Sequence, residues 1–175
     1  MNTYIALFRG INVGGRNTLP MKELVELLEG MNYDNVQTYI QSGNVVFHSK
    51  KKAGPKDAAE IGRKVLEKKG FEPTVLLLSE ADLQSAVEHN PFATSNGKAL
   101  HFFFLAAASR GPNIKRLESM KANSEKFALC KNVFYLYAPD GVGRSKLVAN
   151  VEKALGVSVT ARNWNTVSKL VSMIG

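Results

Sequence analysis

The chain has 175 residues, of which 45% are hydrophobic and 22% are charged, and its formal net charge is +8. These proportions are typical of a globular protein, and no apolar run approaches the roughly 20 residues that a membrane-spanning helix requires. A single cysteine, Cys130, excludes an internal disulfide bond and favours a reducing, cytoplasmic compartment.

The first half of the chain predicts the element order β-α-β-β-α-β. Apolar and β-branched runs indicate strands, and apolar residues that recur three and four positions apart indicate helices. Gly43 and Asn44 lie between two strand-like runs and predict a tight antiparallel hairpin. The expected strands are residues 4–8, 36–41, 45–48 and 74–78, and the expected helices are residues 21–31 and 55–70.

The same element order recurs in the second half. The expected strands are residues 100–105, 126–130, 133–137 and 157–159, and the expected helices are residues 114–120 and 145–155. A connecting helix is expected from Ser79 to Glu88, and a final helix at residues 165–173 with Asn165 as its N-cap. Trp164 precedes that helix, and we expect its indole to anchor the helix against the body of the protein.

Each β-α-β-β-α-β half has the ferredoxin-like pattern. The predicted fold class is α+β, with two tandem ferredoxin-like subdomains, antiparallel sheets and a C-terminal helix. The subdomains are residues 1–80 and 97–175, and residues 81–96 form the connecting helix and loop. Residues 4–8 and 100–105 are mostly apolar without strict alternation, so we expect them to be central strands.

The sharpest chemical pattern follows the first strand, where three glycines and two arginines fall within eight positions. Glycine backbone accepts close approach by a ligand, and arginine matches phosphate or carboxylate. The spacing fits neither a P-loop nor a dinucleotide-binding fingerprint. Two interpretations stand: a structural loop that needs positive φ, or an anion-binding loop. The candidate residues are Arg9, Asn12, Gly14, Gly15, Arg16 and Asn17, with Gly10 between the first two.

Three further segments supply candidate ligand-binding residues. The hairpin segment contributes Gln41, Ser42 and Asn44, whose side chains either stabilise the turn or bind a polar ligand. A second glycine-containing loop ends at Arg144, Ser145 and Lys146, where Ser145 is the expected helix N-cap and not a nucleophile. The segment before the final helix contributes Arg162 and Asn163.

The residue pattern indicates neither a metal site nor a catalytic group. The three histidines are far apart in sequence and none has metal-ligand spacing with the cysteine. No close pair of carboxylates suggests acid–base chemistry, and no cofactor is implied. The net positive charge fits nucleic-acid binding, but a solvated helix face with mixed charges at residues 56–67 explains the densest part equally well.

Several stretches together resemble the DUF1697 family of bacterial proteins, named for a domain of unknown function. The resemblance lies in residues 9–17, 21–24, 38–47, 90–92, 100–101, 135–141, 145–147 and 160–170, which include the segments Gly-Ile-Asn-Val-Gly-Gly, Ser-Gly-Asn-Val-Val-Phe and Ala-Arg-Asn-Trp. It implies a fold with two ferredoxin-like subdomains. It implies no activity, substrate or catalytic residue.

The sequence therefore leaves three functions open. The first is binding of an anionic ligand, either a nucleotide, a phosphorylated metabolite or a nucleic acid, through the Gly/Arg loops. The second is an enzyme that acts on a phosphorylated small molecule in the same loops. The third is a protein-interaction module whose basic surface is incidental. No membrane partner is expected.

Overall fold

The computed structural model describes all residues from Met1 to Gly175 and divides them into two compact units. The first unit comprises Met1–Ser85 and Lys169–Gly175, and the second comprises Ala86–Ser168. Each unit contains one four-stranded antiparallel sheet. The two units are therefore described one after the other.

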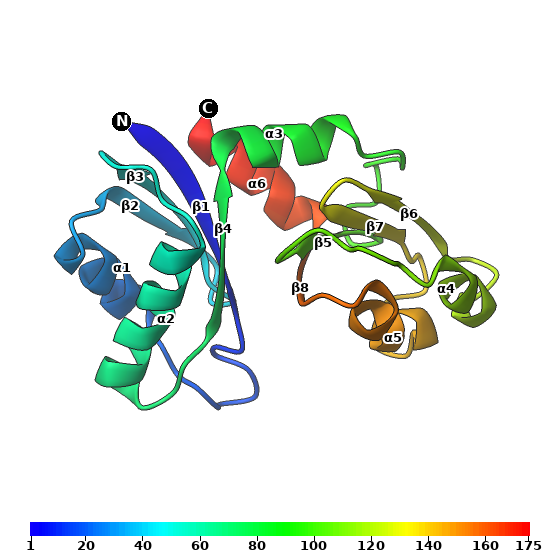
Figure 1. Ribbon diagram of the computed structural model, residues 1–175, viewed down its shortest axis with the longest axis horizontal. Helices are drawn as coiled ribbons and strands as arrows, with labels where there is room; N and C mark the ends of the chain where they lie inside the picture. Colours follow the sequence, from blue (N-terminus) through cyan, green and yellow to red (C-terminus); the bar gives the residue numbers. More distant parts are fainter. The chain divides into compact units, whose positions relative to one another are not determined.

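The sheet of the first unit has the strand order β2-β3-β1-β4. Its strands are β1 (Asn2–Arg9), β2 (Asp34–Tyr39), β3 (Asn44–Ser49) and β4 (Thr74–Ser79). The β1–β3 register runs from Asn2 opposite Ser49 to Leu7 opposite Asn44. Helices α1 (Met21–Gly30) and α2 (Pro55–Lys69) cover one face of this sheet (Figure 1), and α3 (Glu80–Glu88) follows β4.

The sheet of the second unit repeats this topology as β6-β7-β5-β8. Its strands are β5 (Leu100–Leu105), β6 (Lys126–Cys130), β7 (Val133–Tyr137) and β8 (Val159–Asn163). Helices α4 (Ile114–Met120) and α5 (Lys146–Leu155) lie together on one face of it (Figure 1). The last helix, α6 (Trp164–Ile174), starts in the second unit and ends in the first.

The predicted duplication is confirmed. Both β1 and β5 are third in their sheets and pair with a strand on each side. The cores explain this placement, because the inward faces of both strands pack beneath two helices. Phe8 of β1 lies in a cluster with Leu24 and Val65, and Phe103 of β5 lies in a cluster with Leu117 and Val151.

Three details of the sequence interpretation were wrong. The last strand was expected at residues 157–159, but β8 spans Val159–Asn163 because its polar residues pair with β5 at the sheet edge. The predicted cap Asn165 lies inside α6, and the carboxamide oxygen of Asn163 instead accepts from the Thr166 amide at 3.0 Å. The β2–β3 hairpin has a four-residue loop, since Tyr39 pairs with Asn44.

Trp164 has only part of the predicted anchoring role. Its indole is half-buried and lies 5.8 Å from the ring of Phe102, centroid to centroid. The fully buried residues of the same helix are Val167 and Leu170, three and six positions further on. Helix α6 is therefore held by a stripe of apolar side chains, of which the tryptophan is one member.

Candidate functional site

The glycine-rich loop after β1 folds as a small hairpin. Val13 and Arg16 form an antiparallel bridge, and the Arg16 amide donates to the Val13 carbonyl oxygen at 2.9 Å. The two residues between them, Gly14 and Gly15, have φ of +56° and +73°. Two successive positive φ values define a type I′ turn, which glycine forms without steric cost. Turn geometry therefore explains this glycine pair without a ligand.

Two asparagine side chains fasten this loop from within. The Asn12 carboxamide donates to the carbonyl oxygens of Leu19 at 2.9 Å and Gln41 at 2.8 Å, and it accepts from the Leu19 amide at 2.7 Å. The Asn17 carboxamide donates to the Gly10 carbonyl oxygen at 2.9 Å. Both side chains form hydrogen bonds with backbone groups of the loop. These contacts favour the interpretation of a structural loop over that of an anion-binding loop.

The β2–β3 loop lies beside the glycine-rich loop, because Asn12 bonds the Gln41 backbone. Asn44 is fully buried, and its carboxamide donates to the Tyr39 carbonyl oxygen at 3.0 Å and to the Ser42 hydroxyl oxygen at 3.1 Å. Gln41 and Ser42 are exposed, as are Arg9 and Arg16. This end of the first unit therefore gathers nine of the candidate residues, and the asparagines among them have structural contacts.

A pocket lies in the second unit, where the C-terminal end of α4 meets the N-terminal end of α5. Its volume is about 740 Å³. The walls are the segments 119–125 and 140–146, which contribute the predicted residues Arg144 and Lys146 together with Lys121. The other lining residues are Ser119, Met120, Ala122, Ser124, Glu125, Asp140, Gly141 and Ser145.

A buried carboxylate ties the walls of this pocket together. Glu125 is only 4% exposed, and it accepts from the Ala122 amide at 2.7 Å and from the Ser145 hydroxyl at 2.6 Å. The Ser145 hydroxyl oxygen in turn accepts from the Val148 amide at 3.2 Å, as the N-cap of α5. The predicted capping role of Ser145 is thereby confirmed. Glu125 was not predicted, because its partner lies 20 residues away in the sequence.

The rim of the pocket is positively charged. Arg144 and Lys146 are exposed and Lys121 is half-exposed, and none of the three forms an ion pair. The first backbone amides of α5 have no partner within the helix and carry the positive end of its dipole. One acidic side chain, Asp140, shares the rim and accepts from the Ser124 hydroxyl at 2.5 Å. The arrangement favours an anion with a hydrogen-bonding group beside it.

The two remaining candidates lie on β8. Arg162 pairs across the sheet with Phe102 and is partly buried, and burial lowers the pKa of its guanidinium to about 10. Its guanidinium also donates to the Ala161 carbonyl oxygen at 2.9 Å. Asn163 is occupied as the cap of α6. The candidate residues are thus divided between the two units: nine gather at one end of the first unit, whereas in the second unit Arg144 and Lys146 line the pocket and Arg162 and Asn163 lie on β8.

The family comparison agrees with this architecture. The model of the family described as "Protein of unknown function (DUF1697)" matches residues 1–135. The chain belongs to the DUF1697 family. A conserved bacterial protein from Streptococcus pneumoniae has a similar structure, with a TM-score of 0.68, 24% sequence identity and 99% of each chain covered. At that identity the likeness shows the fold alone, and no curated protein matches the chain.

The structure contains neither a membrane-spanning helix nor a cluster of metal-ligating side chains. None of the helices combines the length and the apolar character needed to cross a membrane. No three side chains of histidine, cysteine, aspartate or glutamate lie close enough together to hold a metal ion.

Proposed function

We propose that this DUF1697 protein binds an anionic, phosphorylated ligand in the pocket between α4 and α5. The observation that carries the proposal is the set of three unpaired cations, Lys121, Arg144 and Lys146, around one hollow at a helix N-terminus. Phosphate oxygens accept hydrogen bonds from arginine, from lysine and from the free amides of a helix end. We further propose a cytoplasmic location, since the chain has one cysteine.

The framework beneath the cations supports this proposal. Ser145 and Glu125 hold the start of α5 against the segment before β6, so Arg144 and Lys146 project from a fixed base. A preformed site loses less conformational entropy when it binds its ligand. The glycine-rich loop of the first unit supports the proposal less, because turn geometry explains its glycines and its asparagines bond the backbone.

The proposal is tested by thermal unfolding with inorganic phosphate, nucleotides and phosphorylated sugars. A ligand at 100 times its dissociation constant adds about 2.7 kcal/mol to the free energy of unfolding. The R144Q/K146Q variant is expected to lose the stabilisation. The K56Q/R63Q variant, with the same change in charge on α2, is expected to keep it. Equal stabilisation of both variants, or no stabilisation by any phosphorylated compound, contradicts the proposal.

An enzyme that acts on a phosphorylated small molecule is the second candidate. The observation that favours it is the Ser124 hydroxyl bonded to Asp140 at 2.5 Å on the rim of the same pocket. A carboxylate in that position is able to take a proton from a hydroxyl or a water. Release of inorganic phosphate from phosphorylated compounds by the wild type, and its loss in D140N with ligand binding retained, distinguishes this candidate from simple binding.

A further inference from the structure

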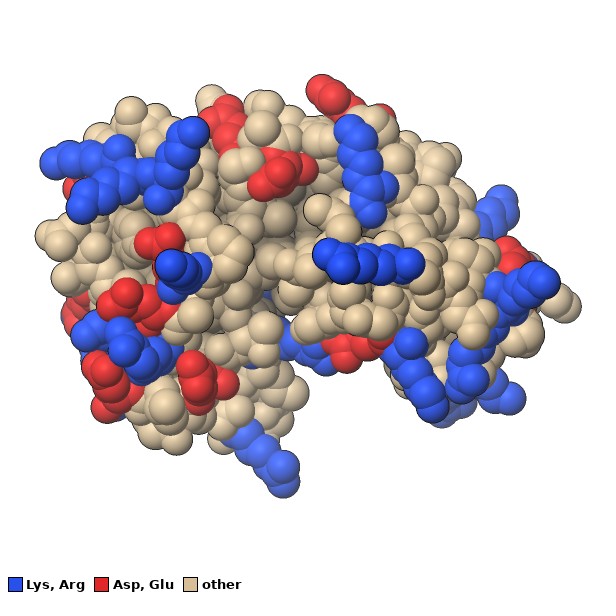
Figure 2. All heavy atoms as spheres, in the orientation of Figure 1, with Lys and Arg blue, Asp and Glu red and all other residues tan.

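The positive charge of the protein is unevenly divided between the two units. The second unit has 11 lysines and arginines against five acidic residues, a net charge of +6. The first unit has 12 against 10, a net charge of +2. The overall charge of +8 is therefore mostly a property of the second unit. In Figure 2, blue side chains outnumber red ones over the part of that unit where Figure 1 draws α4 and α5.

Helices α4 and α5 run antiparallel, so the cations extend beyond the pocket. The Asn113 amide at the start of α4 donates to the Ala154 carbonyl oxygen near the end of α5 at 2.8 Å. Lys115 and Lys153 therefore lie at the end of the helix pair opposite the pocket, and both are exposed. Together with Lys121 and Lys146 at the pocket end, they form a set of four lysines that we call the α4–α5 basic face, with one exposed carboxylate, Glu118, on α4 between Lys115 and Lys121.

The spacing along α5 suits an extended polyanion. Lys146, Asn150 and Lys153 are four and three positions apart and so lie on one side of the helix. The two lysines are separated by about 10 Å along the helix axis. One strand of a B-form duplex carries about three phosphates over that length. A single phosphate would occupy only the pocket end of this surface.

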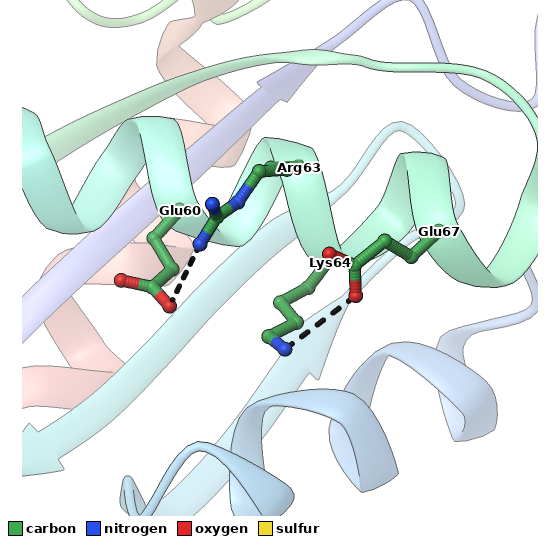
Figure 3. A network of polar contacts seen from close by, with 4 residues as sticks. All are labelled: Glu60, Arg63, Lys64 and Glu67. Atoms are coloured by element: carbon green, nitrogen blue, oxygen red, sulfur yellow. Dashed lines mark hydrogen bonds and ion pairs between the residues drawn. The ribbon is translucent and has the colours of Figure 1, made fainter.

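The basic residues of the first unit differ from those of the α4–α5 basic face, because several of them form ion pairs with carboxylates of the same unit. On α2, Arg63 pairs with Glu60 at 3.2 Å and Lys64 pairs with Glu67 at 3.5 Å (Figure 3). Lys69 pairs with Glu23 of α1 at 2.8 Å. None of the four lysines of the α4–α5 basic face forms an ion pair. These four ammonium groups therefore have no carboxylate partner within the protein.

We infer that the α4–α5 basic face binds the phosphate backbone of a nucleic acid, with one phosphate seated in the pocket. The inference rests on the proposed function, because the pocket supplies one end of the contact. Lysine recognises a phosphate as a point charge, so this contact fixes the position of the backbone and does not discriminate base sequence. Much of the affinity comes from counterion release and falls steeply as salt is raised.

Fluorescence anisotropy with a labelled 20-nucleotide single strand and a 20-base-pair duplex tests the inference across 50–200 mM salt. Each lost phosphate contact is expected to lower the slope of log affinity against log salt by about 0.9 for duplex and about 0.7 for single strands. K115Q/K153Q is expected to lower the duplex slope by about 1–2. The K56Q/R63Q control carries the same change in net charge and is expected to leave the slope unchanged.

The outcomes separate this inference from the proposed function. Weaker oligonucleotide binding by K115Q/K153Q, with unchanged stabilisation by inorganic phosphate, supports both. Unchanged oligonucleotide binding, an equal loss in the K56Q/R63Q control, or equally tight binding of polyglutamate overturns the nucleic-acid inference and leaves the phosphate pocket standing. Oligonucleotide binding that is weakened in K115Q/K153Q but unchanged in R144Q/K146Q overturns the inference as stated, because Lys146 belongs to the α4–α5 basic face and the pocket end would then make no contact. It leaves the stabilisation by inorganic phosphate, which tests the proposed function, unaffected.

Discussion

Gly43, in the hairpin loop before β3, is a position where a single added methyl group should be strongly destabilising. Its φ is +88°, a conformation that costs an L-residue with a Cβ about 1–2 kcal/mol. A Cβ built there would lie 2.6 Å from the Cβ of Phe8 and 2.7 Å from the Cδ1 of Ile11. Both neighbours belong to the core of the first unit and are at most 2% exposed, so neither has room to move.

Overpacking of this kind costs about 1–3 kcal/mol. Added to the conformational cost, G43A should lower the free energy of unfolding by about 2–5 kcal/mol, a large part of the total stability of a typical domain. Gly10 provides the matched control. Its φ is +86°, and a Cβ there would meet no atom within 4 Å. The G10A variant should therefore show the conformational cost alone, about 1–2 kcal/mol.

Urea unfolding followed by far-UV circular dichroism measures both variants against the wild type. The expected difference between G43A and G10A is about 1–3 kcal/mol, the steric part of the effect. Equal losses would refute the reasoning, because they would mean that the loop and Phe8 rearrange at no cost. A loss of ligand binding in G43A without a loss of stability would instead assign Gly43 to a binding surface.

Three other substitutions test separate parts of the structure. Ile40 is a β-branched residue at φ +50° and is 49% exposed. Asparagine tolerates this backbone conformation, so I40N should be more stable than I40A by about 1 kcal/mol. Equal urea midpoints for the two variants would show that the backbone is unstrained. S145A should lower the free energy of unfolding by about 1–3 kcal/mol, since α5 loses its cap and buried Glu125 loses a donor. In the same urea assay, S119A should change the free energy of unfolding by no more than about 0.5 kcal/mol. Burial lowers the pKa of His101 below its ordinary 6.5, so the unfolded chain takes up this proton at higher pH than the folded chain does. The free energy of unfolding should therefore fall as the pH drops through 6.5, and H101Q should show a smaller fall over the same range.

The sequence predicted the fold well because local patterns determine most of it. Gly70 and Gly156 end α2 and α5 with positive φ, and Lys131 lies in the β6–β7 turn. Each of these features depends on residues that are close together in the sequence. Strand β8 was misplaced because an edge strand with polar residues resembles a loop. Its pairing with β5 is a contact between residues more than 50 positions apart, which no local pattern reveals.

The candidate site was predicted only in part, for a similar reason. Arg144 and Lys146 were correctly placed at the start of a helix, and the structure adds a pocket beside them. The contribution of Lys121 and Glu125 depends on how the segment after α4 meets α5. The glycine-rich loop shows the converse case. Its composition suggests an anion site, whereas consecutive positive φ values at Gly14 and Gly15 satisfy a turn.

The division of the chain into units has a consequence for synthesis on the ribosome. The first unit is discontinuous, since Lys169–Gly175 belongs to it while the 83 residues of Ala86–Ser168 intervene. Lys169 lies over the ring of Tyr39, with its ammonium nitrogen 6.0 Å from the ring centroid, so this late segment contacts the end of an early strand. During translation at about 5–20 residues per second, the nascent first unit waits several seconds for its last segment. Throughout that interval the first unit lacks Lys169–Gly175, so the contact between Lys169 and the Tyr39 ring forms only after the whole second unit has been synthesised.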